Sequence, residues 1–182
     1  MNKNKKICMI VLTLFLVSGI NTYAVVMKKG KIGIGWGGYP IVRYWLGPKL
    51  GIELGADFNL QTTTAKNAVN TNSFFLSGKF LKTLFDSGDL NINFGLGMNI
   101  NAVSNVGGVD GAGQTDIDLY SLLDFEYFLK NIPNLSFGGS IGFVITPSIY
   151  KPPKGDTVIT TRTDFFANGF SLGTIAIRYY FY

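Results

Sequence analysis

The chain contains no histidine and only one cysteine, Cys8, among its 182 residues. Without histidine it lacks the side chain that most often serves as a general base near neutral pH. A single cysteine leaves no partner for an intramolecular disulfide. Charged residues are also scarce, at 15% of the chain, whereas a soluble globular protein typically carries about 25%. These absences exclude histidine-based acid–base catalysis and a disulfide framework, and they argue against an ordinary soluble protein.

The first 24 residues have the composition of a secretory signal peptide. Three lysines within the first six residues precede an uncharged, apolar stretch at 7–20, and small residues occupy positions 22 and 24. This order matches a positive n-region, an apolar h-region and a cleavage site, here between Ala24 and Val25. The apolar run is shorter than the roughly 20 residues of a spanning helix, so a membrane anchor is the weaker interpretation. We therefore expect a signal peptide at 1–24 and one domain at 25–182.

The charge of the remaining chain is close to balanced. Three of the 16 basic residues lie in the leader, which leaves 13 basic against 11 acidic residues. The formal net charge of +5 is thus largely a property of the leader, and it gives no argument for a nucleic-acid partner. No stretch after residue 24 is apolar enough to predict a transmembrane helix.

The segment from Leu90 to Ala102 alternates without interruption between apolar residues and asparagine or glycine. A period of two over this length predicts a β-strand with one apolar and one polar face. The segment is longer than an ordinary strand, but it suits a transmembrane β-strand, which needs about 9–11 residues.

Eight such strands are predicted along the chain, and the connections between them alternate in length. Their expected bounds are Lys31–Gly38, Ile41–Leu46, Leu50–Leu60, Ser73–Phe85, Leu90–Ala102, Thr115–Leu129, Leu135–Ile149 and Phe165–Phe181. Tight turns follow strands two, four and six, and longer polar links at 61–72, 104–114 and 151–163 follow strands three, five and seven. This alternation is typical of outer-membrane barrels, which have short periplasmic turns and longer extracellular loops. The even strand count places both chain ends on the side of the short turns.

The residues on the two strand faces favour a barrel that is apolar on its outside. A soluble lipocalin-like barrel would direct its apolar face inward and present lysine and glutamate to water. Here the polar faces consist largely of glycine, asparagine and serine, which suit a crowded interior. The apolar faces of strands three, five, seven and eight carry no charge, and aromatic residues gather near strand ends, as in the girdles of membrane barrels. The alternative is aromatic core packing in a secreted β-sandwich.

Two stretches resemble outer-membrane β-barrel domains of the OmpA/OmpX type. Residues 42–53 read VRYWLGPKLGIE and are similar to a hairpin of such domains, and residues 177–181 read IRYYF and are similar to their closing strand. The resemblance implies an all-β, eight-stranded antiparallel up-and-down transmembrane β-barrel with periplasmic N- and C-termini. It also implies export through the general secretory pathway to the bacterial outer membrane and a monomeric state. Its partners would be outer-membrane lipid and, during biogenesis, the barrel assembly machinery.

The resemblance makes Tyr179, Phe181 and Tyr182 the insertion signal of the last strand. Tyr182 is an additional residue, because the family ends on the preceding aromatic position. If Phe181 takes that position, Tyr179 faces lipid and Arg178 faces the lumen. If Tyr182 takes it, Arg178 faces lipid, which is costly. We therefore expect the register in which Phe181 ends the strand.

The predicted inner faces of the strands carry most of their charge. The inward residues are Lys31, Arg43, Glu53, Asp57, Lys79, Asp118, Asp124, Glu126 and Arg178. An eight-stranded barrel has an interior just wide enough for side chains to fill, and isolated charges there are costly unless they pair. We expect a lumen charge network of seven residues, centred on Arg43 and Arg178 against Glu53, Asp124 and Glu126 and including Asp57 and Lys79. It is interpreted as a polar plug that stabilises the barrel, and a narrow ion path or gate is the alternative.

The sequence gives no sign of a catalytic, cofactor or metal site. Known outer-membrane barrel enzymes, such as the lipid A deacylase, the lipid A palmitoyltransferase, the omptin proteases and the outer-membrane phospholipase, use histidine as a general base, so their mechanisms are excluded. Asp116 with Asp118, and Asp124 with Glu126, form i, i+2 pairs on one strand face that could act as acid and base or bind Ca²⁺. Positions in the lumen or at its rim explain these pairs better.

We therefore expect a non-enzymatic barrel without a cofactor, whose role is structural or lies in surface contacts through the loops at 61–72, 104–114 and 151–163. The sequence does not identify the surface ligand. Two alternatives stay open, a small transport pore with a polar, charge-lined lumen and a secreted soluble lipid-binding barrel.

Overall fold

The computed structural model describes residues 30–61, 69–165 and 176–181. The strands within them are β1 (Ile32–Trp36), β2 (Pro40–Trp45), β3 (Leu50–Leu60), β4 (Asn72–Asp86), β5 (Leu90–Ser104), β6 (Gly113–Leu129), β7 (Ile132–Lys151), β8 (Val158–Phe165) and β9 (Ala176–Phe181). A single 3₁₀ turn, η1 (Val106–Gly108), lies between β5 and β6. The expected signal peptide, with its Ala24–Val25 cleavage site, and Tyr182 lie outside the described residues. No helix in the described part of the chain is long and apolar enough to cross a membrane.

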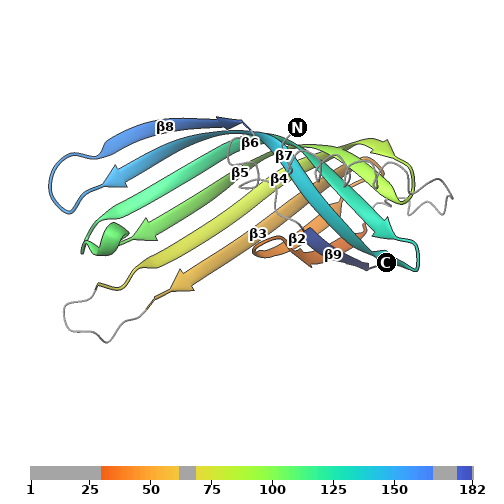
Figure 1. The fold of residues 1–182 in the computed structure, drawn as a ribbon, viewed down its shortest axis with the longest axis horizontal. Coiled ribbons are helices and arrows are strands. Elements are labelled where there is room, and N and C mark those ends of the chain that lie inside the picture. The colour runs from red at the N-terminus through yellow and green to blue at the C-terminus, as the bar shows by residue number, and fades with distance from the viewer. Residues whose placement is uncertain (1–29, 62–68, 166–175, 182) are drawn as a thin grey trace, which may run out of the picture.

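The strands form one closed antiparallel barrel (Figure 1). Successive strands from β1 to β7 pair with one another, and β9 closes the ring by pairing with both β1 and β7. β8 pairs with β7 further along the same edge, so β8 and β9 together occupy the eighth position of the barrel. The predicted fold class, an all-β barrel of eight antiparallel up-and-down strands, is confirmed.

The strand register gives the barrel a stagger that the sequence pattern does not contain. Paired residues can be followed around the ring from Leu135 of β7 through Tyr179, Ile34, Val42, Leu54, Gly78, Met98 and Leu119 back to Ile145 of β7. The path returns ten residues further along the strand, at position 145 instead of 135. With ordinary strand spacing and rise, eight strands and this stagger require a tilt of roughly 40° from the barrel axis.

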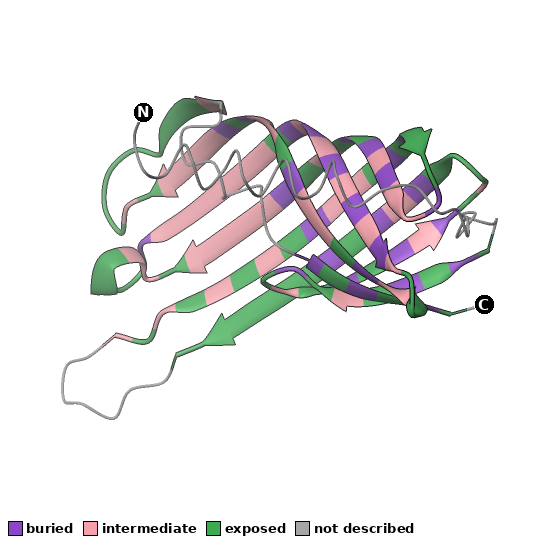
Figure 2. Ribbon diagram, turned by 45° about the vertical axis from the view of Figure 1, so that its right-hand side comes forward, coloured by how far each residue is buried: buried purple, intermediate pink, exposed green. Residues whose placement is uncertain are grey.

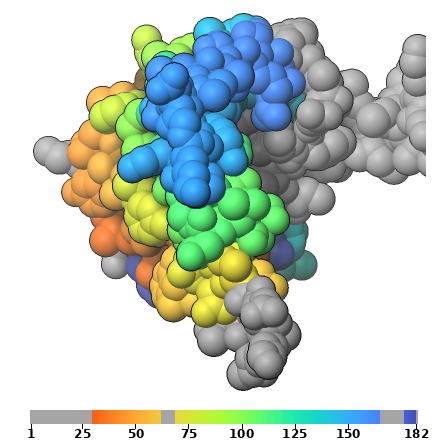
Figure 3. Space-filling model, turned by 90° about the vertical axis from the view of Figure 1, so that its left-hand side faces the viewer, coloured from red at the N-terminus to blue at the C-terminus, as the bar shows by residue number. Residues whose placement is uncertain are grey.

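One end of the barrel, named here the turn end, is formed by short connections. Turns at 46–49, 87–89 and 130–131 join β2 to β3, β4 to β5 and β6 to β7. The first and last strands also meet at this end, through the pair Ile32–Phe181. The opposite end carries the longer connections and is named the loop end. There the β7–β8 turn and the β5–β6 connection lie side by side (Figure 3), and a Cβ atom added to Gly111 would lie 3.6 Å from Cβ of Pro153.

The barrel wall is higher on one side of the ring than on the other. β1, β2 and β9 are short, with five or six residues each. Because β2 pairs only with residues 51–55 of β3, residues 56–60 of β3 pair with β4 alone. Within the described residues, β8 likewise pairs with β7 alone. The sheet from β3 to β8 therefore extends past the closed ring at the loop end (Figure 1).

The alternating pattern located the first seven strands to within three residues of their observed ends, and β3 has the predicted bounds. The predicted loop at 151–163 is wrong, because β7 continues to Lys151 and residues 158–163 belong to β8. Those residues read VITTRT, and their β-branched side chains favour a strand although threonine is polar. The predicted strand Phe165–Phe181 corresponds to the last residue of β8 and to β9, and residues 166–175 lie outside the described part.

Side chains alternate between the interior and the outer surface of the barrel, as the burial pattern along each strand shows (Figure 2). The largest fully buried side chains are those of Trp45, Arg43, Tyr180 and Phe128. On the outer surface, apolar side chains such as Ile34 and Leu54 are 52% and 57% exposed. Charge is thus gathered inside the barrel and apolar surface outside, the reverse of a soluble barrel.

Candidate functional site in the barrel interior

Arg43 lies at the centre of a charged layer inside the closed ring. It is fully buried, and its guanidinium contacts carboxylates from two strands. Its Nε donates to Oε2 of Glu53 on β3 at 2.7 Å. Nη1 and Nη2 donate to the two oxygens of Asp124 on β6, both at 3.1 Å, and Nη1 also donates to Oε2 of Glu126 at 3.0 Å. Only arginine presents enough donors in a planar fork to bind three carboxylates in this way.

Arg178 and Lys79 bring further positive charge to the same carboxylates. Nε of Arg178, on β9, donates to Oε2 of Glu53 at 3.0 Å. Its Nη2 lies 3.5 Å from Oδ1 of Asp124, and its Nη1 lies 3.6 Å from Oε1 of Glu126. Nζ of Lys79, on β4, lies 2.6 Å from Oε1 of Glu53. Glu53 is therefore shared by three cations from three strands.

Neutral side chains occupy the remaining acceptor positions of the carboxylates. The hydroxyls of Ser136 and Tyr180 each donate to Oε1 of Glu126 at 2.6 Å. Asp124 accepts hydrogen bonds from Ser140 at 3.2 Å and from Asn93 at 3.3 Å. Carboxylates buried in a low-dielectric interior are stable only with this degree of hydrogen bonding.

The charged layer is balanced in sign. Within the described residues, the cations of Arg43, Arg178 and Lys79 face the three carboxylates named above, and none of the six side chains is more than 10% exposed. Removing one member of a buried ion pair typically costs 3–5 kcal/mol, roughly, because the other charge is left uncompensated. Each charge in this layer has an opposite charge beside it, so the layer contains no uncompensated buried charge.

An aromatic cluster fills the interior between the charged layer and the turn end. Trp45, Phe128 and Tyr180 are fully buried and pack together, and the ring centroids of Phe128 and Tyr180 lie 5.6 Å apart. Nζ of Lys31 lies 5.5 Å from the centroid of the Tyr180 ring, in a cation–π arrangement. Through its hydroxyl bond to Glu126, Tyr180 joins this cluster to the charged layer.

A second packed layer lies on the loop-end side of the charges. The rings of Tyr39 and Phe75 have centroids 4.6 Å apart, and Tyr120 packs with Leu122 in a buried cluster. A Cβ atom at Gly97 would come within 2.6 Å of the Tyr120 ring. The inner-face glycine thus supplies the space that the tyrosine fills. The interior therefore contains three successive layers of packed side chains.

The structure brings together six of the seven residues that the sequence assigned to the lumen network. They are Arg43, Glu53, Lys79, Asp124, Glu126 and Arg178. Asp57 is the exception, because it is exposed and forms no ion pair with any described residue. It lies in the part of β3 that extends past β2, where the ring no longer encloses the inner face. The correct strand face was therefore not sufficient to predict burial.

The sequence interpretation did not identify the neutral hydrogen-bond donors of the network. Ser136, Ser140 and Tyr180 are inner-face residues by the same period of two that identified the charges. The period of two could have identified these residues as facing the interior. It could not show which inner-face hydroxyls donate to a carboxylate, because this depends on the stagger between strands.

The last strand places Tyr179 and Phe181 outside and Arg178 and Tyr180 inside. Arg178 is buried, whereas Tyr179 and Phe181 are 44% and 49% exposed on the outer surface. This is the register expected when Phe181 ends the strand. Tyr182 lies outside the described residues.

The carboxylate pairs have ordinary partners. Asp118 accepts a hydrogen bond from Thr146 at 2.6 Å, and Asp116 accepts from Gln114 at 3.0 Å. Asp124 and Glu126 are engaged by the arginines. In the described part of the chain, no cluster of three or more acidic, histidine or cysteine side chains is arranged to hold a metal ion.

No protein-family model, curated protein or solved structure matches the chain. The OmpA/OmpX-type resemblance therefore stays a prediction carried by the residues at 42–53 and 177–181.

Proposed function

We propose that the chain is a non-enzymatic integral outer-membrane β-barrel, with a structural role or a role in contacts at the cell surface. The observation that carries the proposal is the distribution of charge across the barrel wall. Among the described strand residues, the outer face bears charge only at Lys82 and Lys151, near strand ends. A lipid-facing surface requires such an uncharged band.

The height of the apolar outer face matches a bilayer. Apolar residues occupy every outward position of β3 from Leu50 to Leu60. Ten steps of roughly 3.3 Å, tilted by roughly 40°, span about 25 Å along the barrel axis, the usual height of the lipid-facing band in outer-membrane barrels. Aromatic residues Tyr44 and Tyr179 lie toward the turn end, as an interfacial girdle would.

The packed interior favours a plug over a transport pore. The ion pairs of the charged layer join strands on opposite sides of the barrel, such as β2 with β6 and β9 with β3. An ion entering this layer would have to displace one of these charges. For the same reason a soluble lipid carrier is disfavoured, since the interior holds charges where a carrier needs an apolar cavity.

The loop end supplies a surface for contacts outside the membrane. β7 has 20 residues, which at the same rise and tilt reach roughly 50 Å along the axis, about twice the apolar band. At this tilt the last residue of β7 lies roughly 12 Å beyond Leu60 along the axis, so the loop-end parts of β6, β7 and β8 would stand above the lipid. The β5–β6 connection and the β7–β8 turn would form the exposed tip.

Single-cysteine labelling in whole cells tests the location and the orientation together. Cys8 lies in the expected leader, so each introduced cysteine would be the only one in residues 25–182. Val109→Cys lies beside η1 at the loop end, and Ser87→Cys lies in a turn at the turn end. A membrane-impermeant maleimide should label Val109→Cys in intact cells and Ser87→Cys only after the outer membrane is opened. Equal labelling of both sites in intact cells, or the reverse order, would contradict the proposal.

A further inference from the structure

A second group of charges lies on the inner face of the sheet, on the loop-end side of the charged layer. Two neighbouring cross-strand rows contain it. The row nearer the loop end consists of Asp57, Phe75, Asn101 and Asp116. The row below it, nearer the turn end, includes Ser77, Asn99 and Asp118. The carboxylates of Asp57, Asp116 and Asp118 are named here the acidic inner face.

The acidic inner face has no cation of its own among the described residues. Asp118 accepts hydrogen bonds from Thr146 at 2.6 Å and from Asn99 at 3.4 Å, and both donors are neutral. Asp116 accepts from the Gln114 amide at 3.0 and 3.1 Å. By contrast, each carboxylate of the charged layer contacts at least one arginine. The three negative charges are therefore uncompensated within the described part of the chain.

The other inner-face cations of this region are already engaged. Nζ of Lys79 lies 2.6 Å from Glu53 in the charged layer. Arg162, on the inner face of β8, pairs with Asp164 at 2.6 Å. The acidic inner face is also open to solutes, because Asp57 is exposed and Asp116 and Asp118 are half-buried.

Asn99 adds a buried acceptor that has no donor. The residue is 8% exposed, and its Nδ2 donates to Asp118, so its amide lies against the acidic inner face. Its Oδ1 is buried and accepts no hydrogen bond from any described residue. A buried amide oxygen without a donor is costly, and a ligand with N–H groups removes that cost. Acceptors thus exceed donors here in both charge and number.

An aromatic pair stands beside the acidic inner face. The ring centroids of Tyr39 and Phe75 lie 4.6 Å apart, and Phe75 is directly opposite Asp57 in register. Directly opposed residues of an antiparallel pair have Cβ atoms about 5 Å apart. An ammonium group that pairs with Asp57 therefore also lies close to an aromatic ring, whose face attracts cations.

The spacing of the carboxylates favours an elongated cation over a metal ion. Asp57 on β3 lies three strands from Asp116 and Asp118 on β6. Three strand spacings are about 14 Å along the sheet, whereas the ligands of one Ca²⁺ ion all lie within about 2.6 Å of it. Within the described residues no three acidic groups are arranged to hold a metal ion. A ligand with a positive charge at each end reaches both sides.

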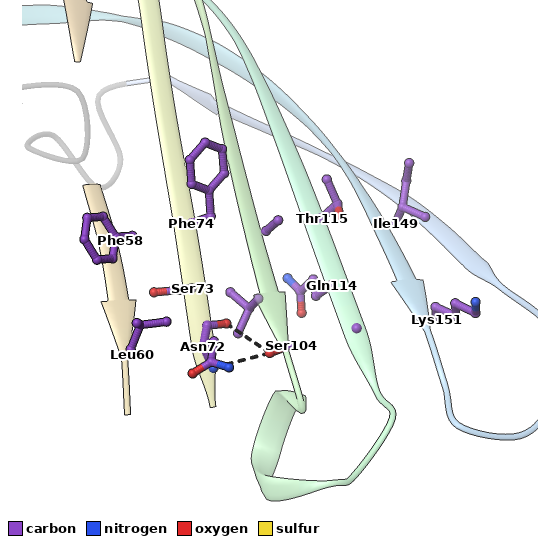
Figure 4. Close-up of a pocket in the computed structure, with 13 residues that line it drawn as sticks. Phe58, Leu60, Asn72, Ser73, Phe74, Ser104, Gln114, Thr115, Ile149 and Lys151 are labelled. Atoms are coloured by element: carbon purple, nitrogen blue, oxygen red, sulfur yellow. Dashed lines mark hydrogen bonds between the residues drawn. The ribbon is translucent and has the colours of Figure 1, made fainter. Parts of the chain in front are cut away.

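The outer surface at the same end offers no alternative site for a cation. A hollow of about 630 Å³ lies there (Figure 4). Its described lining contains one charged residue, Lys151, and no carboxylate. The hydroxyl of Ser104 is bonded to the backbone of Asn72 across the two strands (Figure 4). This hollow would repel a cation, so the acidic inner face is the site to consider.

We propose that the acidic inner face binds a linear aliphatic amine with an ammonium group at each end. One ammonium pairs with Asp57 beside the Phe75 ring. The other pairs with Asp118 and donates to Oδ1 of Asn99, and Asp116 adds to the attraction. The packed layers beneath block the way toward the turn end, so the amine enters and leaves at the loop end. The inference rests on the proposed function only in placing that end outside the membrane.

Calorimetric titration of the refolded barrel in a non-ionic detergent measures this binding. The probes are 1,5-diaminopentane and 1,8-diaminooctane, with pentylamine as the ligand of single charge and CaCl₂ as the metal. At low salt the better diamine should bind about tenfold more tightly than pentylamine, because the second ammonium adds a charge-assisted hydrogen bond. Ca²⁺ should bind more weakly than that diamine.

Three substitutions locate the two ends of the diamine. Asp57→Asn and Asp118→Asn each remove the charge at one end, and each should lower diamine affinity about tenfold, to that of pentylamine. Phe75→Leu should lower it about threefold through loss of the ring face. A mobility shift between unboiled and boiled samples confirms that each variant is folded before it is titrated.

Two variants serve as matched controls. Asp110→Asn removes an exposed carboxylate from the β5–β6 connection, and Asp156→Asn removes one from the β7–β8 turn. Both lie at the loop end but outside the two cross-strand rows. They change the net charge of this end by the same amount as Asp57→Asn, and both should bind the diamine as the unmodified barrel does.

The outcomes separate the inference from the proposed function. Diamines that bind no more tightly than pentylamine, or Ca²⁺ that binds more tightly than both, overturn the amine site and leave the membrane barrel intact. An equal loss of affinity in Asp110→Asn and Asp57→Asn would assign the binding to net charge alone and also overturn the site. Since the titration is made in detergent, a reversed labelling order in whole cells with diamine binding retained would contradict only the proposed function.

Discussion

Replacement of Arg43 by methionine is the perturbation that bears most directly on the interior. The substitution keeps much of the side-chain volume and removes a cation that contacts Glu53, Asp124 and Glu126. Arg178 and Lys79 remain, so three carboxylates face two cations. Loss of one partner from a buried ion cluster costs about 3–5 kcal/mol, because the uncompensated carboxylate stays desolvated.

Urea unfolding of the refolded barrel measures this loss. Trp45 is fully buried between the charged layer and the turn end and reports on the interior, and Trp36→Phe removes the other, exposed tryptophan. With a urea dependence of about 2 kcal/mol per molar, the Arg43→Met midpoint should fall by roughly 2 M. The control is Arg162→Met. This substitution removes an ion pair with Asp164 in which the arginine side chain is exposed. An exposed pair contributes about 0–1 kcal/mol, so its midpoint should fall by less than roughly 0.5 M.

A second substitution distinguishes charge balance from packing. Glu126→Gln added to Arg43→Met removes the excess negative charge, while the amide oxygen can still accept hydrogen bonds from Ser136 and Tyr180. The double variant should be more stable than Arg43→Met alone, a coupling that neighbouring charges are expected to show. Arg43→Met with a midpoint no lower than Arg162→Met, or no recovery in the double variant, would refute the balanced charged layer.

Three further predictions follow from the packed interior. Gly142→Ala should lower the free energy of unfolding by about 1–3 kcal/mol, because its Cβ would meet the backbone oxygen of Ser121, whereas Gly139→Ala, with open space around its Cβ, should change the urea midpoint little. Ser136→Ala removes a hydrogen bond to the Glu126 carboxylate and should cost about 1.5–3 kcal/mol in the same assay, and a loss below 0.5 kcal/mol, roughly, would count against that bond. In planar bilayers the unmodified barrel should give no discrete conductance steps, and regular steps at neutral pH would restore the pore alternative.

The sequence was sufficient for those features that depend on a period of two. Leu50–Leu60 was predicted as a strand with its observed bounds, and Arg43 and Glu53 were both assigned to the inner face. The period of two did not predict which residues contact one another across the barrel. Arg43 and Asp124 are 81 residues apart in the chain, and only the stagger of ten residues brings them into contact. Stagger is a property of the closed ring and leaves no local pattern in any one strand.

Two differences between expectation and structure have separate causes. Asp57 lies on the predicted inner face, but the short β2 leaves that part of β3 outside the ring, and strand length around a ring is set by all the neighbours together. Residues 158–163 were interpreted as a loop because they are polar, although their β-branched side chains favour the observed β8. At the edge of a sheet, polarity gives less information about strand formation than backbone propensity does.

We propose a closed barrel that resides in the outer membrane. The most direct measurement is electrophoretic mobility after outer-membrane fractionation, with boiled and unboiled samples run side by side. We expect a band in the outer-membrane fraction whose mobility changes on boiling, because a closed barrel with a packed, charge-paired interior resists detergent until it is heated. A chain recovered in a soluble fraction, with the same mobility before and after boiling, would contradict it.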